Sequence, residues 1–134
     1  MTVLLAIDQG SSSSRCVVFD GELRVLAQAS RPVASSFPAD GWVEHDPGEI
    51  VASVLGAVGD AMSKAHMAWA DVGGIGLAAQ TETFVVWERA TGQAVYPAIS
   101  WRDGRGAGLC ERLRAAGHAD EIRGRTGLPL EAGA

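Results

Sequence analysis

Short apolar runs separated by polar turns dominate the first thirty residues of the chain. Three such runs, each of strand length, lie within residues 3–30, and the first of them is continuously apolar, as in a strand covered on both faces. The pair Asp20–Gly21 between the second and third runs is typical of a hairpin turn. The pattern predicts an antiparallel meander of three strands over residues 3–30.

A helical period follows a Pro-, Ser- and Gly-containing loop. Apolar residues recur every three or four positions after Asp46, which predicts a helix over 47–67 with Asp46 as its cap and Pro47 in its first turn. Further apolar runs predict strands within 74–101, and the last periodic segments predict helices. The expected elements are strands over 74–79, 83–88 and 95–101, a helix over 105–117, and a short helix over 119–126.

The order of these elements defines the fold class. Strands come first, and a helical crossover then leads back to a strand, which predicts an α/β chain with a mixed sheet flanked by helices. With 134 residues, 47% of them hydrophobic, the chain is one domain or part of a larger one.

Charge and composition exclude several functions. Eleven Lys and Arg residues against sixteen Asp and Glu give a net charge of −5, which disfavours binding to nucleic acid or to an anionic membrane. Neither a membrane-spanning run nor a basic leader is visible. Two cysteines, Cys16 and Cys110, are too few for a disulfide framework and are expected to be reduced thiols of a cytoplasmic protein.

The first candidate site is the Gly- and Ser-rich turn between the first two predicted strands. Gly10, Ser11, Ser12 and Ser13 offer backbone N–H groups and hydroxyls to one point, which suits a phosphate because phosphate offers only acceptors. Asp8, at the end of the first strand, is placed to hold a hydrated magnesium ion. The alternative is an ordinary hairpin turn without a ligand.

Two further candidates follow later strands. Gln80, Thr81 and Glu82 come directly after the strand predicted over 74–79, where polar side chains suit a small hydroxylated ligand; a solvated turn is the alternative. Trp101 and Asp103, which lie two residues apart, combine an apolar ring with a charge, as in sugar and polyol sites, although a core tryptophan at a strand end is the favoured alternative on these residues alone.

His45 also has catalytic chemistry, but it directly precedes the predicted helix cap and has no nucleophile arranged beside it. A structural role is favoured for it.

Taken together, these segments resemble one family. Residues 6–15, with the sequence AIDQGSSSSR, resemble the first phosphate motif of the FGGY carbohydrate kinases, and of their glycerol kinase branch in particular. Residues 41–47, 76–92, 98–105 and 126–130 resemble further motifs of that family in the same order and spacing. Each motif alone is weak, but five in order are specific.

The resemblance implies a ribonuclease-H-like fold of the actin and sugar-kinase type, incomplete in this chain. It also implies that ATP, with magnesium, phosphorylates a hydroxyl of a polyol or sugar. Asp8 would serve the magnesium ion, residues 10–13 would cradle the phosphates, and Arg15 would lie near the γ-phosphate. Glu82 and Trp101 would contact the polyol.

The chain departs from the glycerol kinase pattern at two positions. Thr81 stands where glycerol kinases carry a polyol-binding Arg, and Gly133 lies near the place of an aromatic residue, so a different polyol or a sugar is a candidate acceptor. The family's general base and adenosine motif would lie beyond residue 134. No catalytic residue is therefore assigned within the chain, and the chain alone is expected to be inactive.

Three interpretations remain open on the sequence. The first is that the chain is part of a truncated or split kinase. The second is a non-catalytic polyol-binding module, and the third is a decayed remnant. One expected partner is the small acceptor molecule. A second is either the remainder of a kinase or another copy of this chain, because a sheet that is cut in the middle leaves an exposed edge.

Overall fold

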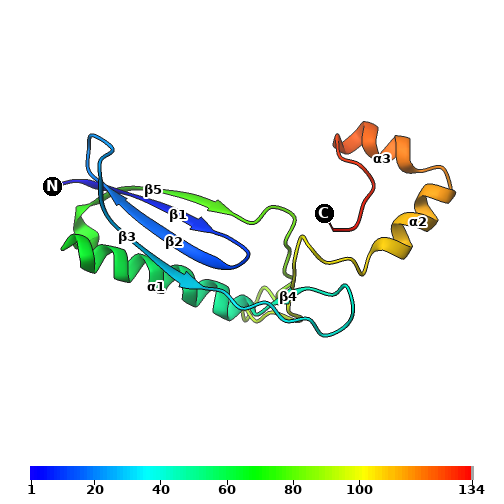
Figure 1. Ribbon diagram of the computed structural model, residues 1–134, viewed down its shortest axis with the longest axis horizontal. Coiled ribbons are helices and arrows are strands. Elements are labelled where there is room, and N and C mark those ends of the chain that lie inside the picture. Colours follow the sequence, from blue (N-terminus) through cyan, green and yellow to red (C-terminus); the bar gives the residue numbers. More distant parts are fainter. Residues whose placement is uncertain (134) are drawn as a thin grey trace.

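A mixed four-stranded sheet with one long helix forms one end of the molecule (Figure 1). In this computed structural model, which describes residues 1–133, the strands are β1 (Val3–Gln9), β2 (Ser13–Phe19), β3 (Val25–Pro32) and β5 (Val72–Ala79). Their order is β3-β2-β1-β5, with β1 parallel to β5 and the other pairs antiparallel. The mixed α/β sheet predicted from the sequence is therefore confirmed.

The helix α1 (Pro47–Ala65) packs on one face of this sheet, against β2 and β3 above all. As predicted, Asp46 caps it, accepting hydrogen bonds from the N–H groups of Gly48 (2.6 Å) and Glu49 (3.2 Å). The helix ends at Ala65, two residues earlier than predicted, because His66 adopts a left-handed conformation (φ +55°) and its N–H bonds back to the last turn.

The core lies between α1 and the sheet. Alternate residues of β1 and β2 point toward the helix, which presents small side chains that allow a close approach. The buried members are Val3, Leu5, Cys16, Val18, Ala29, Ala57, Val58, Ala61 and Met62.

The remaining elements are short. β4 (Glu44–His45) lies in the segment predicted as loop, and it pairs with β6 (Ala98–Ile99); a single 3₁₀ turn (Trp69–Asp71) precedes β5. The helices α2 (Ala107–Ala115) and α3 (Ala119–Thr126) lie at the end of the molecule away from the sheet (Figure 1). α2 is two residues shorter at each end than predicted.

Two strand predictions are wrong. Residues 83–88 form only isolated bridges, Phe84 with Ile99 and Trp87 with Ala94, and most of the large apolar side chains there are exposed. The strand predicted over 95–101 is reduced to β6, since Pro97 has no N–H for a ladder.

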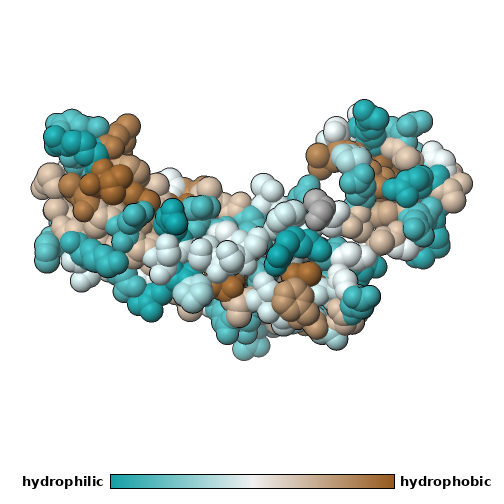
Figure 2. All heavy atoms as spheres, viewed as in Figure 1, coloured by the Kyte–Doolittle hydropathy of each residue, from teal (hydrophilic) through white to brown (hydrophobic). Residues whose placement is uncertain are grey.

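Apolar surface remains uncovered along β5 and at the β2–β3 turn. In the part of the chain that the structure describes, β5 pairs only with β1, and Ile75 and Leu77 are 55% and 68% exposed. Figure 2 shows another apolar area at the end that carries the β2–β3 turn, where Leu23 and Val25 are exposed. An exposed edge with apolar neighbours is compatible with the expected association, which stays a prediction.

Among residues 1–133, no helix combines the length and the apolar character that crossing a bilayer requires.

Candidate functional site

The predicted phosphate loop connects β1 to β2, but it is shorter than expected. Only residues 10–12 form the turn, while Ser13 and Ser14 already belong to β2. The N–H of Gly10 donates to the carbonyl of Ser13 (2.9 Å), and Ser12 accepts from the N–H of Val33 (2.9 Å). The loop is thus held in place by backbone hydrogen bonds on both of its sides.

Ser14 points away from this loop. Its hydroxyl is buried under α1, 2.7 Å from the hydroxyl of Ser53. Since Ser53 donates to the carbonyl of Ile50 (2.7 Å), Ser14 is the donor of the pair.

Hydrogen bonds join the loop to both predicted acceptor segments. The indole Nε1 of Trp101 donates to the hydroxyl of Ser11 (2.8 Å), which in turn donates to Oε1 of Gln80 (3.3 Å). The amide of Gln80 also donates to Oε1 of Gln9 (3.2 Å) and to the carbonyl of Gly10 (3.3 Å). Three candidate segments, up to 90 residues apart in sequence, therefore meet in one place.

Thr83 completes this connection. Its hydroxyl accepts the backbone N–H of Trp101 (3.0 Å) and donates to the same Oε1 of Gln80 (3.0 Å). Thr83 was not among the predicted site residues, although its position directly after the candidate segment Gln80–Glu82 indicated that it could belong to the same site.

A cavity of about 600 Å³ opens beside this connection. Glu82, Trp101 and Asp103, all predicted from the sequence, line it together with Arg105, Phe84, Leu128 and Glu131. Thr81 is exposed and is not among the lining residues. Gly133 also lines the cavity at φ +72°, and a Cβ there would meet the carbonyl of Asp103 at 3.0 Å, so an aromatic residue would not fit this backbone unchanged.

Glu82 has a strained backbone. Its φ is +66°, in the left-handed region that residues with a Cβ rarely adopt and that costs roughly 1–3 kcal/mol where the surroundings hold it. Strain of this kind concentrates at ligand sites, so a carboxylate held at a cavity wall in this way is consistent with binding.

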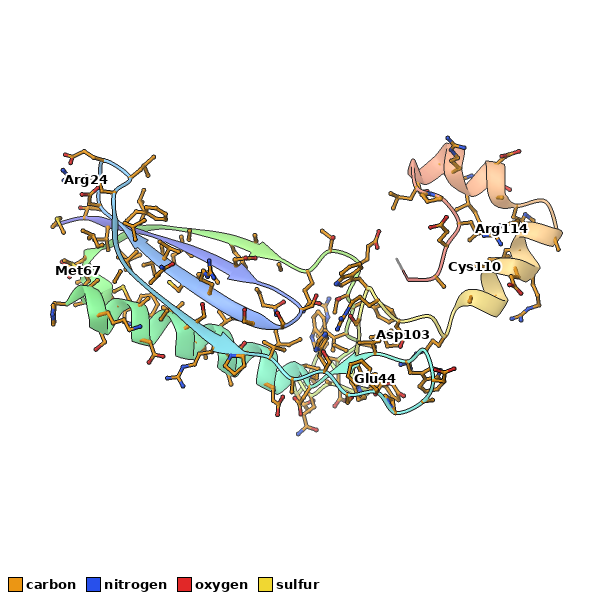
Figure 3. The ribbon with its side chains drawn as sticks, viewed as in Figure 1. Arg24, Glu44, Met67, Asp103, Cys110 and Arg114 are labelled. Carbon is orange, nitrogen blue, oxygen red and sulfur yellow. The ribbon has the colours of Figure 1, made fainter. Side chains whose placement is uncertain are left out.

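Asp103 has a different role from the one predicted. Figure 3 shows it close to Glu44 of β4, and both carboxylates are buried. Asp103 accepts from the N–H of Val43 (2.6 Å), from the N–H and Nε of Arg105 (2.9 and 2.8 Å), and from Nη2 of Arg105 (2.7 Å). Because its oxygens already serve groups of the chain, Asp103 holds the cavity wall rather than presenting a free carboxylate to a ligand.

Arg105 is the centre of this charged cluster. Its Nη2 also donates to Oε1 of Glu44 (2.7 Å), which accepts from the hydroxyl of Tyr96 (2.9 Å), and its guanidinium carbon lies 3.9 Å from the ring centre of Trp42. The Arg105 guanidinium lowers the pKa of Asp103 to about 2, and the two carboxylates raise the pKa of Arg105.

The predicted magnesium ligand lies on the other face of the sheet from α1. Asp8 is exposed and stands opposite Arg15 in the β1–β2 register, while Arg15 donates from Nε to the hydroxyl of Ser30 (3.3 Å). Within residues 1–133, no group of three or more His, Cys, Asp or Glu side chains is arranged to hold a metal. A single carboxylate still fits magnesium, which retains most of its water and is usually bound by one or two carboxylates together with phosphate oxygens.

His45 is buried in β4. Its Nδ1 lies 2.8 Å from the carbonyl of Ala34, so the ring ties two segments of the loop before α1 together, as the structural interpretation expects. Its Nε2 has no partner among the described residues.

The mixed sheet, with the polar loop between β1 and β2 and the adjoining cavity, is the type of fold that the sugar-kinase motifs implied, and comparison with known proteins gives the family. Residues 3–134 match the N-terminal domain of the FGGY family of carbohydrate kinases. The chain belongs to this family, as its motifs indicated.

The similar proteins include glycerol kinases from several bacteria. The chain is 50% identical over 132 residues to the glycerol kinase of Delftia acidovorans and 51% identical over 128 residues to that of Afipia carboxidovorans. These alignments cover 98% and 96% of the chain and 26% of each relative. The chain therefore spans about a quarter of the length of these relatives.

A solved structure gives the same fold. The crystal structure of Plasmodium falciparum glycerol kinase with ADP superimposes with a TM-score of 0.87 at 28% identity, over 98% of this chain and 26% of that one. The mixed sheet with its flanking helices thus matches the N-terminal part of a kinase of this family.

Proposed function

We propose that this chain is the N-terminal, acceptor-binding part of an ATP-dependent kinase of glycerol kinase type. Such an enzyme transfers the γ-phosphoryl group of ATP to a hydroxyl of a polyol or sugar. The observation that carries the proposal is the hydrogen bond from Trp101 to Ser11, because it places the loop proposed for phosphate directly beside the cavity proposed for the acceptor. Phosphoryl transfer requires this proximity.

The residues have separate roles in this proposal. Glu82 accepts hydrogen bonds from vicinal hydroxyls, and Trp101 covers the C–H face of the acceptor. Gln80 and Asp103 hold the cavity in shape through their hydrogen bonds within the chain.

The phosphate side is proposed for the loop end of β1 and β2. Residues 11–13 donate to phosphate oxygens in this proposal, while Gly10 closes the turn through its bond to Ser13. Arg15 neutralises charge, and Asp8 would hold a magnesium ion. The ion would neutralise the charge of the phosphates during transfer. The ADP in the Plasmodium structure supports nucleotide use in the family.

Acceptor binding is tested by NMR titration of the ¹⁵N-labelled chain with glycerol, xylitol and D-xylulose. We expect saturable shifts of the Trp101 indole signal, and at least fivefold weaker binding in Glu82→Gln, while Glu111→Gln on the exposed side of α2 binds as the original chain does. Equal binding by both variants would remove Glu82 from the site. No shift with any of the three compounds would refute the acceptor site.

Activity is tested separately with a coupled ADP-release assay containing magnesium, ATP and the same compounds. We expect no acceptor-dependent turnover by the 134 residues alone, since a missing general base costs roughly 10²–10⁴ in rate. Turnover above about 1 s⁻¹, the low end for kinases, would show that the chain is active by itself.

A further inference from the structure

The cavity beside the loop contains one cationic side chain among several carboxylates. Arg105 lines it together with Glu82, Asp103 and Glu131. The N–H donors of a guanidinium have a fixed planar arrangement. A ligand can therefore use only those N–H groups that are not already bonded within the chain.

Most of the donors of Arg105 are spent within the chain. Nε donates to Asp103, and Nη2 donates to both Asp103 and Glu44. The side-chain hydrogen bonds that join Arg105 to Asp103 and Glu44 do not use Nη1. Among residues 1–133, Nε2 of His45 is the only side-chain nitrogen or oxygen that is both buried and without a hydrogen-bond partner, so Nη1 of Arg105 is not buried in this way. Nη1 is therefore accessible, on a side chain that is 20% exposed and lines the cavity.

The rest of the cluster fixes the orientation of this free group. The planar guanidinium stacks at 3.9 Å on Trp42 and is held at its other nitrogens by two buried carboxylates. A donor pair that is immobilised before binding costs little entropy when a ligand accepts from it.

We propose that Arg105 is a further acceptor-binding residue, whose Nη1 donates to a hydroxyl of a neutral polyhydroxylated molecule in this cavity. The inference rests on the proposed function, and it narrows the acceptor class.

The charge balance gives this selectivity. Asp103 and Glu44 more than neutralise the guanidinium, leaving the cluster at −1, and Glu82 and Glu131 on the cavity wall bring the total to −3. A neutral polyol meets donors and acceptors without charge repulsion, whereas a sugar acid brings a carboxylate into a region of its own sign.

Side-chain ¹⁵N NMR of the guanidinium tests the proposal on the unmodified chain. The probes are xylitol and xylonate, a matched pair that differs in the acidic group. We expect xylitol to shift the Arg105 guanidinium and the Trp101 indole together with the same saturation curve, and xylonate to require at least tenfold higher concentration for the same shift.

The outcomes separate this inference from the proposed function. If xylitol shifts Trp101 but leaves the Arg105 guanidinium unchanged, the acceptor site stands and the assignment of Arg105 is wrong. If xylonate binds as tightly as xylitol, the charge argument is wrong. If neither compound binds, and glycerol and D-xylulose do not bind either, the proposed function fails and this inference fails with it.

A variant supplies a second test. Arg105→Lys keeps a positive charge beside Asp103 and Glu44 but removes Nη1, so we expect at least fivefold weaker binding of xylitol. The control is Arg102→Lys, since Arg102 is exposed and does not line the cavity. A retained Trp101 indole signal establishes that the variant is folded, and a folded Arg105→Lys variant that binds xylitol with unchanged affinity would overturn the proposal.

Discussion

Replacing Asp103 by Asn removes one charge from the centre of the buried cluster and leaves its shape almost unchanged. The carboxylate accepts four hydrogen bonds, three from Arg105 and one from the N–H of Val43. An Asn side chain has one acceptor oxygen and turns an N–H₂ group toward donors on its other side. Breaking a buried ion pair costs about 3–5 kcal/mol, and because Arg105 keeps Glu44 as a partner, we expect the lower end, about 3 kcal/mol.

The same carboxylate gives a pH dependence whose sign is fixed by its pKa. The pKa of Asp103 is lowered from 3.8 to about 2 in the folded chain, mainly by the hydrogen bonds from Arg105. Its contribution to stability is therefore fully present above pH 3.8 and is lost as the pH falls through about 2. At 1.36 kcal/mol per pKa unit, this contribution is about 2 kcal/mol.

Urea unfolding followed by tryptophan fluorescence measures both quantities, at pH 7 and in steps from pH 5 to pH 2. The carboxyls of Asp20 and Asp60 also have lowered pKa values, but they are present in both proteins and cancel in the difference. We expect the difference in the free energy of unfolding between the original chain and Asp103→Asn to decrease as the pH falls. Asp120→Asn, at an exposed carboxylate, is the control. The reasoning would be refuted if Asp103→Asn lowered the free energy of unfolding by less than about 0.5 kcal/mol at pH 7, or if its difference from the original chain did not change with pH.

Three further predictions concern other parts of the chain. Ser53→Ala leaves the buried hydroxyl of Ser14 without an acceptor and should cost about 1–3 kcal/mol in urea unfolding, and the double variant with Ser14→Ala should cost less than the sum of the single changes; strict additivity would contradict the hydrogen bond. Glu82→Gly relieves the left-handed backbone and should raise the free energy of unfolding by about 1 kcal/mol while weakening xylitol binding in the NMR titration, whereas a less stable variant would argue against strain. Arg31→Ala breaks an exposed two-point ion pair with Asp60, so we expect a small loss of stability in urea unfolding at 50 mM salt that disappears in 1 M salt; a loss that persists in 1 M salt would show that packing is responsible.

Local patterns predicted the sheet and its helix well. The meander over 3–30 follows from short apolar runs and one hairpin turn, and the cap at Asp46 follows from a few neighbouring residues. In both cases, the interactions that decide the structure lie within or next to the segment itself. For the same reason, the turn between β1 and β2 could be predicted from its own residues, and its role in binding phosphate stays a prediction.

The apolar residues of 83–88 show where local reasoning fails. Their alternation is that of a strand, but a strand needs a neighbour along its whole length, and β6 offers only two residues. Strand propensity expresses the fit to an existing sheet and cannot create one.

The Arg105 cluster lay beyond prediction for another reason. Asp103 and Arg105 are two residues apart, so their pairing was within reach, but Glu44 of β4 and the preceding Val43 lie some 60 residues earlier. Only the tertiary structure decides that these groups meet. The same contact converts Asp103 from a candidate ligand into a support, because a carboxylate that is saturated by its own chain has nothing left to offer.

The two halves of the chain therefore depend on different forces. The sheet and α1 share an apolar core, whereas the cavity is held by hydrogen bonds and one buried ion cluster that connect β4, β6 and the loop after β1. Apolar burial is not screened by salt and depends only weakly on pH, while charged contacts are screened by salt and depend on pH. Stability of the sheet alone consequently does not guarantee a formed site. The hydrogen bond between Ser11 and Trp101 is decisive here, because it is where the polar network is anchored to the sheet and where the phosphate and acceptor sides of the proposed reaction are brought into contact.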